Sequence, residues 1–214
     1  DASHPDLSRG IVISGRNITD AANRRDTSDI YGHGTHVAGI IAALSRDSGG
    51  ATGVAFDCSI LAVKALNDLG FGFLSDVADG IYYAADHGAR VINLSLSGPD
   101  SAILREAIDY AYGKGCVVVA AGGNGGNAFM AYPAAYGNVI AVAATDDADS
   151  LAVFSNRSKK AARGRRSGVN HRSRYRNRSR NTQFPQVTVA RHGRITQSRM
   201  RQPRSTSPAG RPLP

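Results

Sequence analysis

The sequence predicts a doubly wound α/β domain with a mainly parallel sheet, followed by a basic tail. Two observations carry this prediction. Short, continuous apolar runs alternate with helix-like segments, as in parallel sheets whose two faces are covered by helices. The composition then changes abruptly near residue 160. We therefore expect a folded domain over residues 1–160 and a disordered, Arg- and Pro-rich tail over residues 161–214.

Apolar runs mark the expected strands. They cover residues 10–14, 59–65, 90–96, 116–121 and 139–144. The last two, CVVVAA and VIAVAA, contain no polar residue, which is typical of strands buried on both faces.

Three segments between these runs predict helices. Residues 34–44 are rich in small and aliphatic side chains. Residues 73–87 carry apolar side chains at three- and four-residue spacing, with Gly88 as the expected C-cap. A third helix is marked by Leu104, Ala107, Ile108 and Ala111 and ends near residues 113–115.

The charge is divided between the two parts of the chain. Residues 1–149 hold all 17 acidic residues and nine basic ones, a net charge of −8, whereas residues 150–214 hold 17 basic residues and no acid. The tail, residues 161–214, has 14 Arg, five of the eight Pro and one Leu, so it cannot bury enough apolar surface to offset chain entropy. No apolar run is long enough for a transmembrane helix, and two Cys exclude a disulfide scaffold.

The segment Gly32-His33-Gly34-Thr35-His36-Val37-Ala38-Gly39 is the strongest motif. A histidine placed just before a helix of small residues can face a cleft and transfer protons, because the helix packs closely behind it. The alternative interpretations are a structural histidine or a metal pair at i and i+3, over which the motif taken alone moderately favours catalysis.

Further motifs occur in order around it: Asp1 to Leu7 (DASHPDL), Gly53-Val54-Ala55, Ala62-Val63-Lys64, Val91 to Leu96 (VINLSL), Val118 to Asn124 (VVAAGGN) and Tyr132-Pro133-Ala134. Together these segments resemble the subtilisin-like serine proteases (subtilases) over residues 1–160. The resemblance implies the subtilisin-like fold and peptide-bond hydrolysis by Ser-His-Asp acyl transfer.

The resemblance also implies roles for individual residues. His33 matches the general base, His36 a structural histidine, and Asn124 the amide that stabilises the oxyanion. The strand that pairs with an extended polypeptide substrate matches Ser95, Leu96, Ser97 and Gly98, where Ser97 departs from the usual Gly. One wall of the substrate pocket matches Ala121, Gly122 and Gly123. Taken alone, Asn124 could be a turn residue, and a serine within a strand, such as Ser95, is usually an ordinary strand residue.

Two members of the triad have no match. No Gly-Thr-Ser occurs in the 214 residues, and Ser207 lies in a Pro- and Arg-rich context. Asp1 matches the second aspartate of the family's Asp-Thr-Gly-x-Asp box, so the catalytic aspartate would precede it. We expect an inactive fragment with an incomplete sheet that lacks a central strand, and a shifted reading frame after about residue 160.

The resemblance further implies structural calcium held by Asp6, Leu44 and Asp47, although Asp6 is equally suited to capping a turn after Pro5. It implies secretion, although no signal peptide is present in the chain, and a monomer without membrane attachment. Cys58 and Cys116 precede strands that lie apart in this fold, so both thiols are expected to be free.

Two other functions stay open. The basic tail could bind nucleic acid or another polyanion, although no recognised module accompanies it and no specific nucleic acid is expected. The folded part could instead be a pseudo-protease that binds extended peptides without cleaving them.

Overall fold

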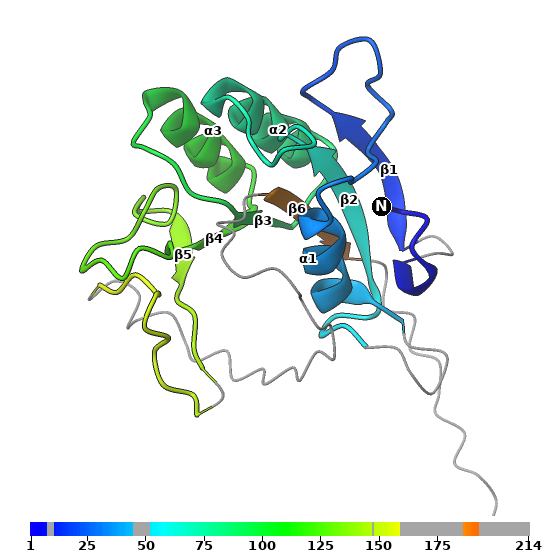
Figure 1. Ribbon diagram of the computed structural model, residues 1–214. Helices are drawn as coiled ribbons and strands as arrows, with labels where there is room; N and C mark the ends of the chain where they lie inside the picture. The colour runs from blue at the N-terminus through cyan, green and yellow to red at the C-terminus, as the bar shows by residue number, and fades with distance from the viewer. Residues whose placement is uncertain (8–10, 45–51, 147, 159–185, 193–214) are drawn as a thin grey trace, which may run out of the picture.

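The computed structural model describes residues 1–7, 11–44, 52–146, 148–158 and 186–192 (Figure 1). Its elements confirm the predicted order of strands and helices. In chain order they are the 3-10 turn η1 (Pro5–Leu7), β1 (Val12–Asn17), α1 (His33–Ala42), β2 (Cys58–Lys64), α2 (Leu74–Asp86), β3 (Val91–Ser95), α3 (Ala102–Gly113), β4 (Val117–Ala121), β5 (Val139–Val142) and β6 (Gln186–His192).

The strands form one six-stranded sheet in the order β1-β2-β6-β3-β4-β5. The pairs β1–β2, β3–β4 and β4–β5 are parallel, whereas β6 is antiparallel to both β2 and β3. Two strands that are each antiparallel to a third run in the same direction. The five strands β1 to β5 therefore point the same way, and their carboxyl ends share one edge of the sheet.

Strand β6 corrects one expectation. The tail was expected to be disordered throughout, but residues 186–192 lie at the centre of the sheet, in register with Cys58 to Ala62 on one side and Val91 to Ser95 on the other. The strand expected to be missing would lie upstream of Asp1, and β6 is not that strand, because it comes from the tail and runs antiparallel to both neighbours. The remainder of residues 161–214 lies outside the described residues.

A local physical reason explains β6. Residues 181–190 contain no Arg, and the β-branched run Val187-Thr188-Val189 favours a strand. Between β2 and β3, backbone N–H and C=O groups on both sides require partners, which β6 supplies. Average tail composition conceals this short segment.

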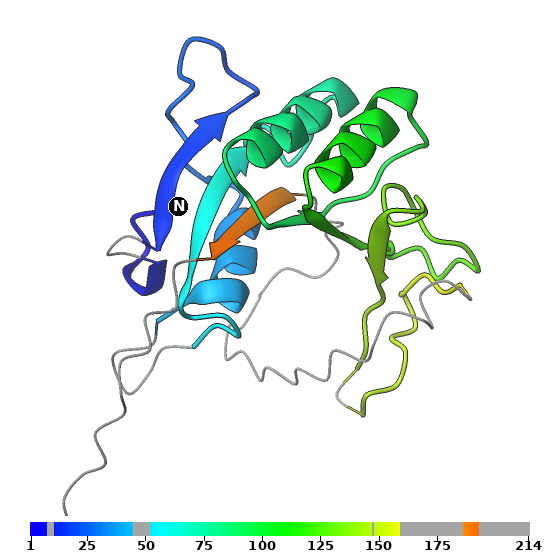
Figure 2. The ribbon, with the colours of Figure 1, turned by 180° about the vertical axis from the view of Figure 1, so that it is seen from behind.

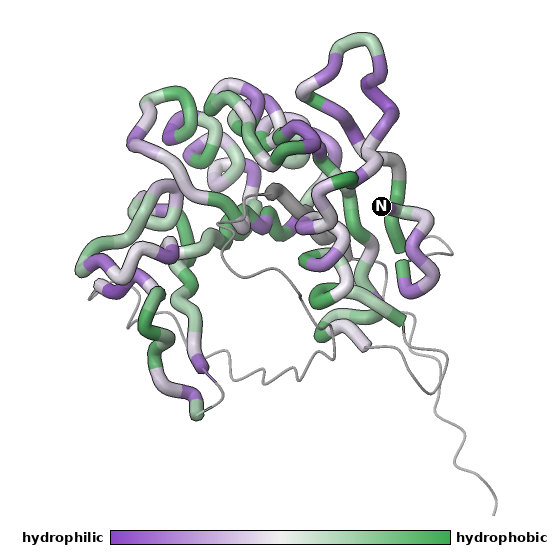
Figure 3. Tube along the Cα trace, in the orientation of Figure 1, coloured by the Kyte–Doolittle hydropathy of each residue, from purple (hydrophilic) through white to green (hydrophobic). Residues whose placement is uncertain are grey.

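Helices cover both faces of the sheet, as Figures 1 and 2 show: α2 and α3 lie together on one face and α1 lies on the other. The larger core lies beneath α2 and α3, and its fully buried members include Ile81, Ile92, Leu94, Leu104 and Ile108. A smaller core lies beneath α1 and contains Leu7, Ile11, Ala38, Ala42 and Ile60. Figure 3 shows mainly apolar strands and a largely hydrophilic loop between β1 and α1.

One half of the sheet keeps an apolar face in contact with solvent. On β3, β4 and β5, side chains directed toward α2 and α3 are buried, whereas alternate residues on the opposite face are not. Val91, Val117, Ile140 and Val142 are 36%, 45%, 47% and 41% exposed. We call these four residues the open sheet face.

Both cysteines are free thiols, as expected. Cys116 is buried and donates a hydrogen bond to the carbonyl of Ala89 (3.1 Å). Among the described residues, no helix is long and apolar enough to cross a membrane.

Candidate active site

His33 is the first residue of α1. The residue before it, Gly32, has φ 84°, a left-handed conformation that side-chain-bearing residues rarely adopt, so a glycine suits this turn. The carbonyl of Gly32 accepts a hydrogen bond from the amide of His36 (3.1 Å), which begins the helix. The His33 ring is half-buried, and its Nδ1 atom is shielded from solvent.

Asp29 fixes this turn. Its carboxylate accepts hydrogen bonds from the amide and the hydroxyl of Thr35 (2.8 and 2.7 Å) and from the amide of Gly32 (2.9 Å). Burial acts to raise the pKa of Asp29, but the hydrogen bonds from Thr35 and Gly32 outweigh it, and the pKa is lowered. An ionised carboxylate thus caps the helix that presents His33.

The environment lowers the pKa of His33. Burial is the main cause, the charge of Asp29 opposes it, and the nearby His36 adds to it. A neutral imidazole results near neutral pH, and only the neutral form can accept a proton. His36 lies on the exposed side of the same helix, and no group of three or more His, Cys, Asp or Glu within the described residues is arranged to hold a metal.

The predicted substrate strand follows β3. Ser95 ends β3, and its hydroxyl accepts a hydrogen bond from the side-chain amide of Asn93 (2.9 Å). Leu96 is 4% exposed and packs into the larger core, so only its backbone is available to a ligand. The Ser97 side chain is exposed, whereas Gly98 donates a backbone hydrogen bond to the carbonyl of Tyr132 (2.9 Å).

The predicted pocket wall follows β4. Ala121 ends β4, and the Gly122 amide donates to the carbonyl of Val142 (2.8 Å) on the neighbouring strand. Asn124 is exposed in the loop beyond Gly123, and its side chain makes no hydrogen bond to any described residue. Its amide therefore faces solvent, where a ligand could reach it.

The sheet topology relates these segments. The loop that leads to His33 follows the carboxyl end of β1, and Ser95, Ala121 and Asn124 lie at or beyond the carboxyl ends of β3 and β4. All of these ends lie at one edge of the sheet. In open α/β sheets, ligands bind outside the carboxyl ends of the strands.

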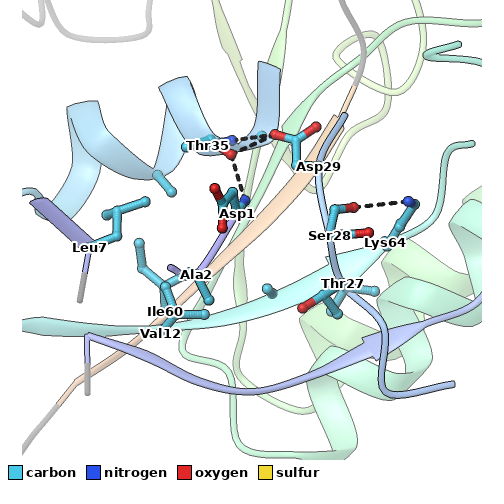
Figure 4. Close-up of a pocket in the computed structure, with 14 residues that line it drawn as sticks. Asp1, Ala2, Leu7, Val12, Thr27, Ser28, Asp29, Thr35, Ile60 and Lys64 are labelled. Carbon is cyan, nitrogen blue, oxygen red and sulfur yellow. Dashed lines mark hydrogen bonds between the residues drawn. The ribbon is translucent and has the colours of Figure 1, made fainter. Parts of the chain in front are cut away.

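A pocket lies beside α1, and Figure 4 shows it. Its lining includes Thr27, Asp29, Thr35 and Ile60, but neither His33 nor Asn124. Within it, the terminal amino group of Asp1 donates to the hydroxyl of Thr35 (2.5 Å). This pocket therefore lies beside α1, and His33 does not line it.

Two of the three predicted calcium ligands lie next to each other. The Leu44 amide donates to the backbone carbonyl of Asp6 (3.0 Å), so these two residues are adjacent. The third predicted ligand, Asp47, lies outside the described residues.

Sequence reasoning missed Asn156. It is 3% exposed, and its side chain hydrogen bonds to residues of the 122–127 loop. Its burial depends on contacts about 30 residues away, and the local sequence carries no signal for them.

A comparison with known protein families shows the family to which the chain belongs. The profile described as "Subtilase family" matches residues 1–193, and the chain belongs to that family. The matched range includes β6.

Individual relatives agree with this assignment. The chain is 53% identical to a "Thermophilic serine proteinase" of Bacillus sp. (strain AK1) over 73% of its own length and 38% of the relative. It is 49% identical to "Thermitase" of Thermoactinomyces vulgaris over 72% of its own length and 54% of the relative. Its structure resembles "Sphericase" with a TM-score of 0.65 and 36% identity, covering 73% of this chain and 55% of that one. The chain thus spans about half the length of the last two proteins.

Proposed function

We propose that this chain carries the general base and the oxyanion donor of a subtilisin-like serine endopeptidase. The observation that supports this proposal most directly is the setting of His33. It begins a capped helix at the carboxyl edge of the sheet, and its pKa is lowered. The sequence motifs and the family assignment supply the chemistry that such a histidine performs.

In that chemistry, a serine hydroxyl attacks the scissile carbonyl while His33 takes the hydroxyl proton. The proton then passes from His33 to the leaving amine. Asn124 donates a hydrogen bond to the oxygen on which negative charge develops. The backbone of Ser95 to Gly98 pairs with the extended substrate, and Ala121 to Gly123 line the pocket for the residue before the cut.

The 214 residues contain no Gly-Thr-Ser, so we propose that this chain does not hydrolyse peptides by itself. In subtilisin, loss of the nucleophile costs about 10⁶ in kcat. The purified chain should leave a chromogenic peptide uncut. Cleavage that a serine-directed phosphonate inhibits would contradict this part of the proposal.

A chimera with thermitase tests the assignment of His33 as the general base. The 155-residue stretch matched in thermitase is replaced by the corresponding residues of this chain, and the rest of thermitase is kept. The chimera should cleave peptides, and His33→Ala should remove nearly all activity because triad members act as a unit. His87→Ala is the control, since His87 is exposed and stacks on Tyr83 (3.8 Å). A chimera that tolerates His33→Ala would disprove the assignment of the base.

The proposal also includes a structural calcium ion and secretion of the protein. The backbone hydrogen bond from Leu44 to Asp6 brings two of the three proposed ligand residues together, and calcium favours carboxylate and backbone carbonyl oxygens. Bound calcium would supply structural cross-linking and no chemistry.

Polyanion binding by residues 161–214 is the second candidate. It is favoured by the 14 Arg of this segment, which has no acidic residue to neutralise them.

A further inference from the structure

The loop formed by residues 122–127, which carries Asn124, is fastened by one buried side chain. The side-chain oxygen of Asn156 accepts hydrogen bonds from the amides of Gly125 and Asn127 (3.0 Å each). Its side-chain nitrogen donates to the carbonyl of Gly122 (3.0 Å). One amide thereby holds three backbone groups on both sides of Asn124.

The backbone around Asn156 reinforces this arrangement. The amide of Asn156 donates to the carbonyl of Gly123 (2.9 Å), and the amide of Gly126 donates to the carbonyl of Phe154 (2.8 Å). The segment that contains Asn156 therefore runs alongside the loop. Because Asn156 is 3% exposed, water cannot readily replace its side-chain hydrogen bonds.

Gly123 permits the close approach. It has φ 101°, and a Cβ built there would lie 2.4 Å from the side-chain nitrogen of Asn156. Any larger residue at position 123 would displace that nitrogen, so the two residues are sterically matched.

Asn124 depends on this scaffold. Its side chain is exposed and has no hydrogen bond to a described residue, so the backbone of the loop sets where its amide points. We propose that Asn156 is a positioning residue for the oxyanion donor: it fixes the 122–127 loop, and through the loop the amide of Asn124. This inference rests on the role proposed above for Asn124. Asn156 itself does not touch the substrate.

Amide hydrogen exchange on the chain tests the scaffold directly. In Asn156→Ala, the amides of Gly125 and Asn127 should exchange about tenfold faster or more, because they lose a buried acceptor. Asn156→Asp keeps an oxygen acceptor for both amides and should retain part of the protection. Asn138→Ala is the matched control, since the Asn138 side chain bonds Asp109 on the exposed surface (2.8 Å). Unchanged exchange in Asn156→Ala would overturn the inference.

Two peptide ligands distinguish a positioning role of Asn156 from a role in folding. The probes are acetyl-Ala-Ala-Ala-Leu with a C-terminal carboxylate and the same peptide as its amide. A product carboxylate places an oxygen where the oxyanion forms, so the chain should favour the carboxylate. The ratio of the two affinities, carboxylate over amide, should fall about tenfold in Asn124→Ala and in Asn156→Ala. The reason is that hydrogen bonds to charged acceptors are strong. Affinity for the amide form should stay the same.

Different outcomes would contradict the role proposed for Asn124 and the role proposed for Asn156. If Asn124→Ala abolishes the preference but Asn156→Ala leaves it intact, Asn156 has no positioning role. If the unsubstituted chain binds both peptides equally, the proposed role of Asn124 fails, and hydrogen exchange alone decides whether Asn156 fixes the loop. If Asn156→Ala weakens both peptides alike, its role is structural and the inference is overturned.

Discussion

Asp29 and Thr35 are joined by two hydrogen bonds, one to the backbone amide (2.8 Å) and one to the hydroxyl (2.7 Å) of Thr35. This double contact links the loop after β1 to the first turn of α1. Since His33 lies in that turn, the contact sets the direction in which the helix enters the site.

Asp29→Ala should therefore destabilise the chain by about 1 kcal/mol, the usual cost of losing a helix cap. Asp29→Asn retains acceptor capacity for Thr35 and should cost less. Urea unfolding followed by circular dichroism measures both. Asp26→Ala serves as the control, because Asp26 is exposed and bonds only locally to Ser28 (2.9 Å), and it should stay within about 0.5 kcal/mol. Equal effects at positions 26 and 29 would exclude the capping role.

Acid should weaken the fold through His33. Its pKa in the folded state is lowered below the ordinary value of 6.5, so the unfolded chain binds the proton more readily. The free energy of unfolding should decrease as the pH falls from above 6.5 through the folded pKa. His33→Gln should show a smaller decrease between pH 7.5 and pH 5 in urea titrations, and His87→Gln is the control. Identical pH dependence in His33→Gln and the unsubstituted chain would contradict the burial of this ring.

Calcium should raise the melting temperature if Asp6 and Leu44 belong to a calcium site. A ligand that binds only the folded state stabilises it by about 2.7 kcal/mol at a hundredfold excess over Kd. Scanning calorimetry with calcium and with chelator measures the difference, and Asp6→Ala should abolish it. A melting temperature that calcium leaves unchanged would remove the site from the proposal.

The basic tail should bind polyanions without sequence preference. Its arginines can neutralise phosphates, and each neutralised phosphate should contribute a slope of about −0.9 to log affinity against log salt for duplex DNA. Competition titrations of the full chain at physiological salt should rank varied DNA, RNA and heparin closely together. A preference of about 10³ for one nucleic acid, the low end for specific binders, would instead indicate a recognition element.

The periodic parts of the fold were predictable from the sequence. Runs such as 116–121 and 139–144 became β4 and β5 because continuous apolar segments favour parallel strands, but only one face of these two strands is buried, whereas the sequence predicted burial of both faces. Strand β6 was not predictable, because its stability comes from pairing with β2 and β3 far along the chain. The candidate site differs in the same way: sequence motifs predict roles for His33 and Asn124, whereas the contact of Asn156 with the 122–127 loop is visible only in three dimensions.

The open sheet face leads us to expect association of the molecule in concentrated solution. Val91, Val117, Ile140 and Val142 form an apolar strip in contact with water, and surfaces of this kind promote association between molecules. The average mass measured by light scattering should rise with protein concentration, and sulfate should promote precipitation. The double substitution Val117→Thr and Ile140→Thr should reduce this rise in average mass without disturbing the cores beneath α1, α2 and α3.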